Sequence, residues 1–159
     1  MRGGQKHWDD PYALIRGYKE PTVCPKCGLV FHEKKWVKNQ ELSSELKFRK
    51  DIHYELCPAC KKIGEHYPMG VVRLSGVFWK AHRTLIENLI RSEEARGLEK
   101  NPLERIMNIK EEVDELVIET TSESLASRIG KVLRRAYKGS LKYEFSKGKK
   151  LVRIKWSRD

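Results

Sequence analysis

The sequence predicts an α+β protein in two parts, a turn-rich N-terminal module and a C-terminal domain of strands and helices. Three observations lead to this prediction. Two Cys-x-x-Cys turns lie within the first 60 residues, an amphipathic stretch covers residues 122–137, and alternating apolar residues follow it to the C-terminus. A helical period flanked by strand periods is typical of a sheet with a helix packed on one face.

Length and charge narrow the class of protein. The chain has 159 residues, which suits one domain or two small ones. With 33 Lys and Arg against 22 Asp and Glu, its net charge is +11, which indicates a polyanionic partner, either nucleic acid or an anionic membrane. No apolar run is long enough to span a bilayer and no signal-like stretch follows Met1, so we expect a cytoplasmic protein that does not bind membranes.

The four cysteines form two nearly equivalent turns, Cys24-Pro25-Lys26-Cys27 and Cys57-Pro58-Ala59-Cys60. Each turn directs two thiolates toward one ion, and together they make a tetrahedral shell that suits Zn²⁺. Because four protein ligands leave no position for water or substrate, we expect one structural zinc ion. Redox or disulfide pairing is the alternative use of these cysteines. A histidine replacing one thiolate is a further alternative, with three candidates: His32, His53 and His66.

The chain then divides into four expected regions. Residues 1–20 form an extended arm, 21–76 a zinc-binding module, 77–100 a connecting helix and 101–159 a basic RNA-binding domain. Trp8 and Tyr12 would anchor the arm to a partner, although a disordered terminus would have the same composition. The predicted fold is thus an N-terminal four-cysteine, zinc-ribbon-like module followed by a helix and a ββαββ antiparallel-sheet domain.

Periodicity and end signals locate the helices. The polar stretch 38–51 is typical of an exposed insertion or a short helix. Ser75 is a candidate cap for the connecting helix, and Gly97 a candidate stop. The apolar stripe of that helix contains Phe78, His82, Leu85, Ile86 and Leu89. For the helix over 122–137, Thr120 and Glu123 match a capping box, and Gly139 follows its end.

Alternating residues predict the strands, at 105–110, at 115–121 and in a final hairpin. Leu141, Tyr143 and Phe145 share one face of the first hairpin strand. Val152, Ile154 and Trp156 share one face of the second, with Arg153 and Lys155 on the other. We expect Tyr143 and Trp156 to lie in the core rather than to stack on bases.

The positive charge is concentrated at the C-terminal end. Residues 126–159 contain 12 basic and two acidic side chains, a net charge of +10, whereas residues 101–125 have a net charge of −5. Such one-sided charge favours binding of a phosphate backbone without reading of bases, although a solvated helix face looks similar. The predicted nucleic-acid-binding residues are Arg128, Lys131, Arg134, Arg135, Lys138, Lys149, Lys150, Arg153 and Lys155.

The sequence contains no enzyme signature. It has no Gly-rich phosphate loop, no Gly-x-Ser-x-Gly and no His-Glu-x-x-His, and its cysteines are assigned to metal. We therefore expect no catalytic residues and no small-molecule substrate. A zinc-containing DNA-binding regulator is an alternative, although the helix over 122–137 offers few Asn or Gln side chains for base edges. A protein-interaction adaptor that docks through the connecting helix is another.

Several segments resemble the NMD family, the archaeal and eukaryotic zinc proteins that bind the large ribosomal subunit. They are Glu119-Thr120-Thr121 with Leu125-Ala126, then Lys138-Gly139, the strand 152–156, and the front end from Glu20 to Trp36. The chain is similar to a compact bacterial or archaeal relative with only two Cys-x-x-Cys turns. The resemblance implies contacts with large-subunit rRNA and ribosomal proteins on the intersubunit side, near where tRNA passes. Subunit assembly or ribosome hibernation would then be the role.

Overall fold

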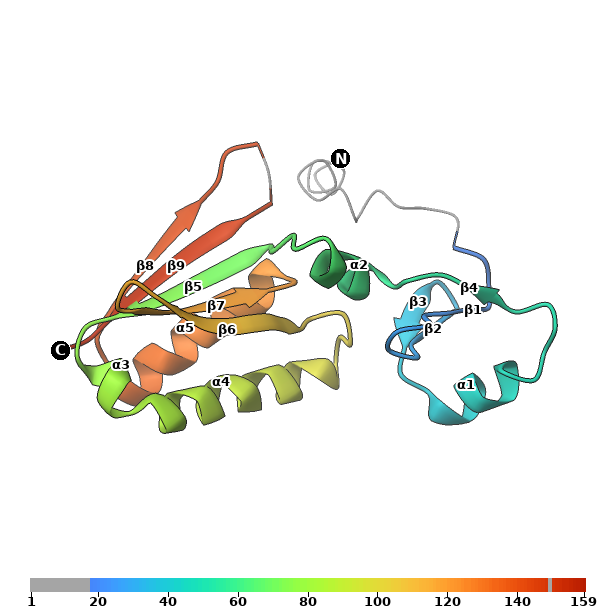
Figure 1. The fold of residues 1–159 in the computed structure, drawn as a ribbon, viewed down its shortest axis with the longest axis horizontal. Helices are drawn as coiled ribbons and strands as arrows, with labels where there is room; N and C mark the ends of the chain where they lie inside the picture. The colour runs from blue at the N-terminus through green and yellow to red at the C-terminus, as the bar shows by residue number, and fades with distance from the viewer. Residues whose placement is uncertain (1–17, 149) are drawn as a thin grey trace. The chain divides into compact units, whose positions relative to one another are not determined.

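Two compact units make up the chain, with the boundary between His66 and Tyr67 (Figure 1). The computed structural model describes residues 18–148 and 150–159. Three residues singled out in the sequence, Trp8, Tyr12 and Lys149, lie outside the described residues. Each unit has its own sheet, in agreement with the predicted α+β class.

The N-terminal unit is a small four-stranded sheet with two short helices. The strand order is β3-β2-β1-β4; β1, β2 and β3 are antiparallel, and β4 runs parallel to β1. Its elements are β1 (Thr22–Val23), β2 (Val30–His32), β3 (Lys35–Val37), α1 (Gln40–Leu46), β4 (His53–Tyr54) and α2 (Pro58–Gly64). Helix α1 is the short helix expected within residues 38–51. Its Leu46 packs with Val23 and Val30 in a separate small core.

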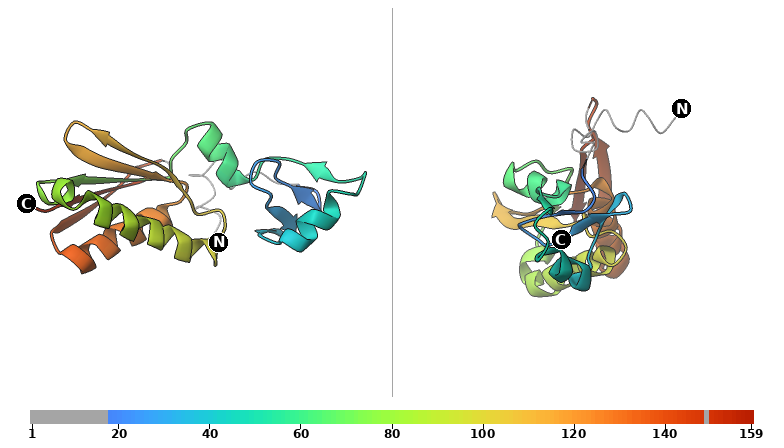
Figure 2. Two further views of the ribbon diagram at one scale, coloured as in Figure 1. Left: turned by 60° about the horizontal axis from the view of Figure 1, so that its bottom comes forward. Right: turned by 90° about the vertical axis from the view of Figure 1, so that its right-hand side faces the viewer.

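The C-terminal unit is a five-stranded sheet in the order β6-β7-β5-β9-β8. Its elements are β5 (Gly70–Ser75), α3 (Phe78–Ala81), α4 (Arg83–Leu98), β6 (Ile106–Glu112), β7 (Glu115–Thr120), α5 (Glu123–Tyr137), β8 (Ser140–Phe145) and β9 (Val152–Ser157). The expected ββαββ order corresponds to β6, β7, α5, β8 and β9. Helices α4 and α5 lie on the same face of this sheet (Figure 2).

Strand β5 changes two expectations. The zinc module is expected to extend to residue 76, but β5 is the middle strand of the C-terminal sheet, antiparallel to β7 and parallel to β9. The sheet is therefore mixed rather than antiparallel. Val72 and Leu74 of β5 are fully buried in the C-terminal core. Only proximity along the chain to the second Cys-x-x-Cys turn favours placing this strand in the metal module.

The expected connecting helix is two helices that belong to the C-terminal core. Ile86 and Ile90 of α4 are fully buried in that core, whereas Leu85 is 56% exposed. His82 separates α3 from α4 and is exposed rather than buried on the stripe. Its ring stacks on Phe78 with 4.1 Å between centroids.

Helix α5 matches the predicted range but not the predicted cap. Ser122 caps it, since its Oγ accepts a hydrogen bond from the Leu125 amide at 3.1 Å. Thr120, the residue expected to cap it, instead donates its hydroxyl to the carbonyl oxygen of Ser122 at 2.6 Å. The apolar stripe of α5 is fully buried against the sheet, with Leu125, Ile129 and Leu133 at 0% exposure.

On the sheet face away from the helices, basic and acidic side chains of β5, β6 and β7 form ion pairs with one another. Arg73 lies 3.3 Å from Glu115, and Lys110 lies 3.1 Å from Glu112 and 3.9 Å from Glu119. The acidic segment of residues 101–125 is thus largely paired within the unit. No helix among residues 18–148 and 150–159 combines the length and the apolar character needed to cross a bilayer.

Replacing Gly76 should destabilise the C-terminal unit. Gly76 has φ +95°, and a Cβ there would lie 2.1 Å from the Arg158 carbonyl oxygen. We expect Gly76→Ala to lower the free energy of unfolding by about 2 kcal/mol or more, measured by chemical denaturation. Gly148→Ala is the control, since Gly148 has φ +79° with open space around it. Equal losses for both variants would mean that the close approach of Arg158 contributes nothing.

Candidate metal centre and basic groove

Parallel pairing of β1 with β4 brings the two cysteine pairs together. Thr22 pairs with His53 and Val23 with Tyr54, and the Glu55 amide extends the ladder to the Val23 carbonyl at 3.2 Å. Parallel strands end at the same edge, so Cys24 after β1 and Cys57 after β4 arrive on the same side. A distance of 33 positions along the sequence is closed by this short ladder.

The two Cys-x-x-Cys turns differ in local structure, although their sequences are alike. In the first, the Gly28 amide donates to the Cys24 carbonyl at 2.9 Å, and Gly28 takes φ +81° to close the turn. In the second, Cys57 caps helix α2, and its Sγ accepts from the Cys60 amide at 3.4 Å. Pro58 starts that helix, where its fixed φ is favourable.

The four sulfur atoms have a spacing that suits one ion. The Sγ atoms of Cys24, Cys27, Cys57 and Cys60 all lie within 4.8 Å of one another, and none is in a disulfide. Cys27 Sγ lies 3.7 Å from Cys57 Sγ. A tetrahedral ion with metal–sulfur bonds of about 2.3 Å needs sulfurs about 3.8 Å apart. The cluster can therefore hold a metal ion without rearrangement of the backbone.

Burial and the shared hydrogen bond both favour the neutral thiol at Cys57. The hydrogen bond with Cys27 raises the pKa of Cys57, and desolvation raises it further. Cys24, Cys57 and Cys60 are buried, and only Cys27 is exposed. A cation that replaces the protons would offset the cost of burying several thiolates at once.

A second set of contacts closes the module beside the cysteines. The Tyr18 hydroxyl donates to the Leu56 carbonyl at 3.4 Å and receives a hydrogen bond from Lys61 Nζ at 3.3 Å. Lys61 also pairs with Glu55 at 3.0 Å, which lowers the pKa of Glu55. The Tyr18 ring packs edge-on against Trp36 at 4.9 Å. These contacts tie the start of the described chain to the second cysteine turn.

The histidine alternative receives no support within the described residues. His53 Nε2 lies 3.3 Å from Glu55 Oε1, and His32 Nε2 lies 3.6 Å from Glu33 Oε1. The group of possible ligands found around the cysteines contains the four thiols alone.

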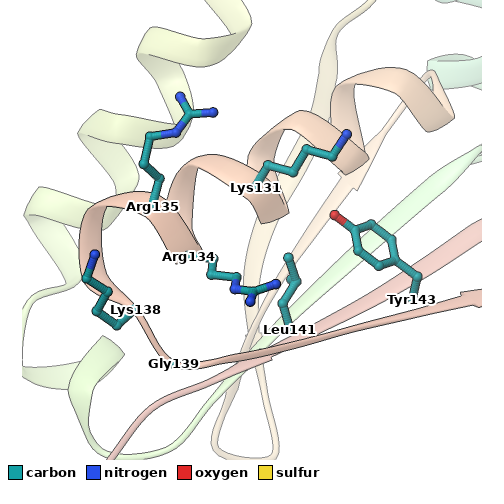
Figure 3. A pocket seen from close by; sticks show the side chains of 7 residues that line it. All are labelled: Lys131, Arg134, Arg135, Lys138, Gly139, Leu141 and Tyr143. Atoms are coloured by element: carbon teal, nitrogen blue, oxygen red, sulfur yellow. The ribbon is translucent and has the colours of Figure 1, made fainter.

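The structure distributes the predicted nucleic-acid-binding residues over several surfaces. Lys131, Arg134, Arg135 and Lys138 line an open groove of about 770 Å³ with Gly139, Leu141 and Tyr143 (Figure 3). Arg153 and Lys155 lie on the opposite face of the sheet, because Val152, Ile154 and Trp156 alternate with them into the core. Lys150 Nζ lies 3.9 Å from a Glu123 carboxylate oxygen.

Arg128 forms ion pairs with carboxylates of its own unit. Its guanidinium lies 2.7 Å from Glu104, 3.3 Å from Glu93 and 2.9 Å from the Ser124 hydroxyl. Glu93 is only 5% exposed and also pairs with Arg96. Arg128 belongs to the same helix as Lys131 and Arg135, but Glu93 of α4 and Glu104 of the following loop neutralise its charge.

The groove is held rigidly at the end of α5. Trp156 Nε1 donates to the Lys138 carbonyl and Arg158 to the Tyr137 carbonyl, both at 2.6 Å. These bonds satisfy carbonyls that a helix end leaves without partners and fix the last turn to β9. Figure 3 shows Arg134 extending toward Leu141 and the Tyr143 hydroxyl turned toward α5. The backbone at the end of α5 is therefore held by Trp156 and Arg158.

Sequence reasoning missed an aromatic lining residue of this groove, Tyr143, and a second exposed ring beside it, Phe145. Tyr143 is expected in the core, but it is 39% exposed, and Phe145 is 67% exposed. Both lie on the helix-facing side of β8, yet β8 is the edge strand, and α5 packs mainly on β9 and β5. Alternation indicates which face a residue shares, but not how far a helix extends over that face. Trp156, on the neighbouring inner strand β9, is fully buried as expected.

Comparison with known proteins adds no relative. No protein-family model matches the chain, and no curated protein matches it at a significant level.

Loss of one thiolate should abolish metal binding and unfold only the N-terminal unit. We expect Cys57→Ser to bind less than about 0.1 equivalent of metal, because the site loses one of its four thiolates. The N-terminal unit should then unfold, because a structural zinc site contributes on the order of 10 kcal/mol to folding. Metal content after gel filtration and thiolate-to-metal absorption of the Co²⁺-loaded protein measure this. His32→Ala/His53→Ala is the control and should retain one equivalent. Full binding by Cys57→Ser would exclude a site made of all four thiolates.

Removing the Arg128 guanidinium should destabilise the packing of α5 on α4. We expect Arg128→Gln to cost about 2 kcal/mol in urea denaturation, below the roughly 3–5 kcal/mol of a broken buried pair, because Arg96 still neutralises Glu93. The double variant Glu93→Gln/Arg128→Gln should recover part of that loss. An Arg128→Gln protein as stable as wild type would show that the ion pair carries no net stability.

Proposed function

We propose that this protein is a non-enzymatic, cytoplasmic RNA-binding protein that acts on the large ribosomal subunit, with one structural Zn²⁺ held by its four cysteines. The observation that carries the proposal is the groove at the end of α5. Four cations from the last turns of one helix line it, and no carboxylate is among its lining residues. A surface of this kind favours a ligand with closely spaced negative charges.

Comparison with other cations of the same unit supports this reading. Arg73, Lys110 and Arg128 each lie within 4 Å of a carboxylate oxygen. For Lys131, Arg134, Arg135 and Lys138, no ion pair is found in the described part of the chain. Four unneutralised cations within three helical turns repel one another, and a polyanion relieves that repulsion.

The choice of ribosomal RNA rests on the resemblance to the NMD family. The segments that carry it include the end of β7, the start of α5 and strand β9, and α5 contacts both strands in the C-terminal unit. The Lys138-Gly139 segment lies in the groove itself. By analogy, the protein would occupy a tRNA or intersubunit surface of the large subunit during assembly or hibernation, in contact with rRNA and ribosomal proteins.

The metal centre supports a structural rather than a catalytic part in this function. Zn²⁺ prefers thiolates at this spacing, and four of them complete its coordination shell. A closed shell provides no activated water, so hydrolysis at the metal is disfavoured. The ion would instead hold the N-terminal unit in the shape that contacts the ribosome.

Charge reversal in the groove should remove the protein from ribosomal fractions. We expect Lys131→Glu/Arg134→Glu to lose at least about 10-fold in affinity for purified large subunits at low salt, measured by cosedimentation. The matched control is Arg153→Glu/Lys155→Glu, which makes the same change in net charge on the opposite face of the sheet. Affinity for wild type should also fall steeply with salt, as phosphate contacts require.

The outcomes separate the candidate functions. Equal losses in both variants would mean that binding follows net charge and not the groove. Wild-type protein found only in the free fraction at low salt would exclude a ribosomal role, and sequence-specific retardation of duplex DNA would then favour the regulator. Comigration with free large subunits in growing cells would indicate assembly, whereas comigration with whole ribosomes in stationary cells would indicate hibernation.

A further inference from the structure

We propose that the groove binds single-stranded RNA, with Tyr143 and Phe145 of β8 as stacking platforms for unpaired bases and the α5 cations as phosphate ligands. This inference rests on the proposed function, because it specifies which kind of RNA the same surface takes. It adds Tyr143 and Phe145 to the predicted RNA-binding residues, all of which are basic. The RNA would then be bound through the faces of its bases as well as through its phosphate backbone.

The two aromatic rings are arranged like a stacking surface. The centroids of Tyr143 and Phe145 are 6.5 Å apart and their planes differ by 8°. They are two residues apart on one face of a strand, which accounts for that separation. Bases in a stacked strand rise about 3.4 Å per nucleotide, so the rings are spaced close to two such steps. A strand of RNA following β8 would meet both rings in the same orientation.

Their exposure contrasts with the burial of the neighbouring strand β9. On the same sheet face, their cross-strand partners on β9 are fully buried, since Tyr143 pairs with Ile154 and Phe145 with Val152. Phe145 nevertheless leaves 67% of its surface exposed to solvent. Exposing a large apolar ring costs free energy that burial would recover, and adjacent exposed aromatics are typical of binding surfaces.

Close packing of α5 over β9 explains why the aromatic face stays open. Gly130 of α5 brings the helix so near the sheet that a Cβ there would lie 3.0 Å from Ile154 and 3.1 Å from Leu141. The helix thus covers the start of β8 at Leu141 and leaves the later residues uncovered. Figure 3 shows Tyr143 beyond the end of Leu141, on the side of the groove facing Lys131.

Charge and aromatic surface meet at one place. Tyr143 lines the groove together with Lys131 and Arg134, so a base on the ring would have its phosphate within reach of a cation. The flanking β8 residues Lys142 and Glu144 point to the other face of the sheet by alternation. The residues that line the groove with Tyr143 include no carboxylate.

The chemistry selects unpaired nucleotides. In a duplex, base faces are covered by their neighbours and only the backbone and groove edges remain accessible, whereas a single strand offers both a face for stacking and a phosphate. Proteins that bind single strands combine a basic groove with aromatic platforms, and each stacked base contributes substantially and with little sequence preference. The groove offers cations and one of the two aromatic rings, and its lining residues include no Asn, Gln, Asp or Glu for reading base edges.

The test is fluorescence anisotropy with the full-length, metal-loaded protein and two labelled probes. One is a single-stranded RNA of about 12 nucleotides, and the other is the same strand in a perfect RNA duplex. We expect wild type to bind the single strand at least about 10-fold more tightly. Tyr143→Ala/Phe145→Ala should lose about 10-fold or more of that affinity. Its affinity for the duplex should change less than about 2-fold.

Two variants make the result specific to stacking. Phe48→Ala/Tyr54→Ala removes two exposed aromatic rings from the N-terminal unit and should bind as wild type. Tyr143→Trp/Phe145→Trp keeps planar rings and should retain preference for the single strand. The slope of log affinity against log salt should be unchanged in Tyr143→Ala/Phe145→Ala, because its phosphate contacts remain. Thermal unfolding of each variant verifies that the fold is kept.

Failure of this inference is distinguishable from failure of the proposed function. Equal binding of wild type to both probes, or equal weakening of both by Tyr143→Ala/Phe145→Ala, would overturn the stacking role. If the variant still cosediments with large subunits in that case, the ribosomal function stands. Aromatic-dependent binding of single-stranded RNA without ribosomal cosedimentation would support the stacking role and overturn the ribosomal assignment. Binding of neither probe would overturn the stacking role, and absence of cosedimentation as well would overturn both.

Discussion

The parallel pairing of β5 with β9 is the constraint on which the C-terminal unit depends. It joins two strands that lie far apart along the chain and buries Leu74 against Trp156 in the middle of the sheet. The ladder continues past the strands, since the Arg158 amide donates to the Ser75 carbonyl and the Phe78 amide to the Arg158 carbonyl. With β9 held there, Trp156 and Arg158 reach the end of α5, and the hairpin strand β8 is left at the edge.

Each unit is stabilised in a different way. The C-terminal unit has a continuous core from α3, α4, α5 and the sheet's inner strands. The N-terminal unit has a core of only a few side chains and brings together four thiols that can hold an ion. An ion bound there would add folding free energy to a module whose apolar core is small. The units can therefore respond differently when metal is removed.

The basic surface depends on which cations remain after internal pairing. Arg128 belongs to the same helix and the same charged segment as Lys131, yet it is taken up by Glu93 and Glu104. The cations of α5 that line the groove lie at the end of this helix, beside β8. That edge also presents Tyr143 and Phe145, so the proposed RNA contacts arise from one arrangement, a helix end held over a sheet it only partly covers.

Local periodicity by itself determined the elements: the range of α5, the final hairpin and the two cysteine turns can be predicted because period and spacing are local properties. Only the tertiary structure decided where those elements lie. Residues 70–75 join the C-terminal sheet because their hydrogen-bond partners are β7 and β9, which no neighbouring residue reveals. The same holds for Tyr143 and Arg128. Alternation predicts the sheet face on which Tyr143 lies, and the charge pattern predicts that Arg128 belongs to a basic helix. Whether Tyr143 is buried and whether Arg128 is paired depend on the elements, distant in sequence, that pack beside them.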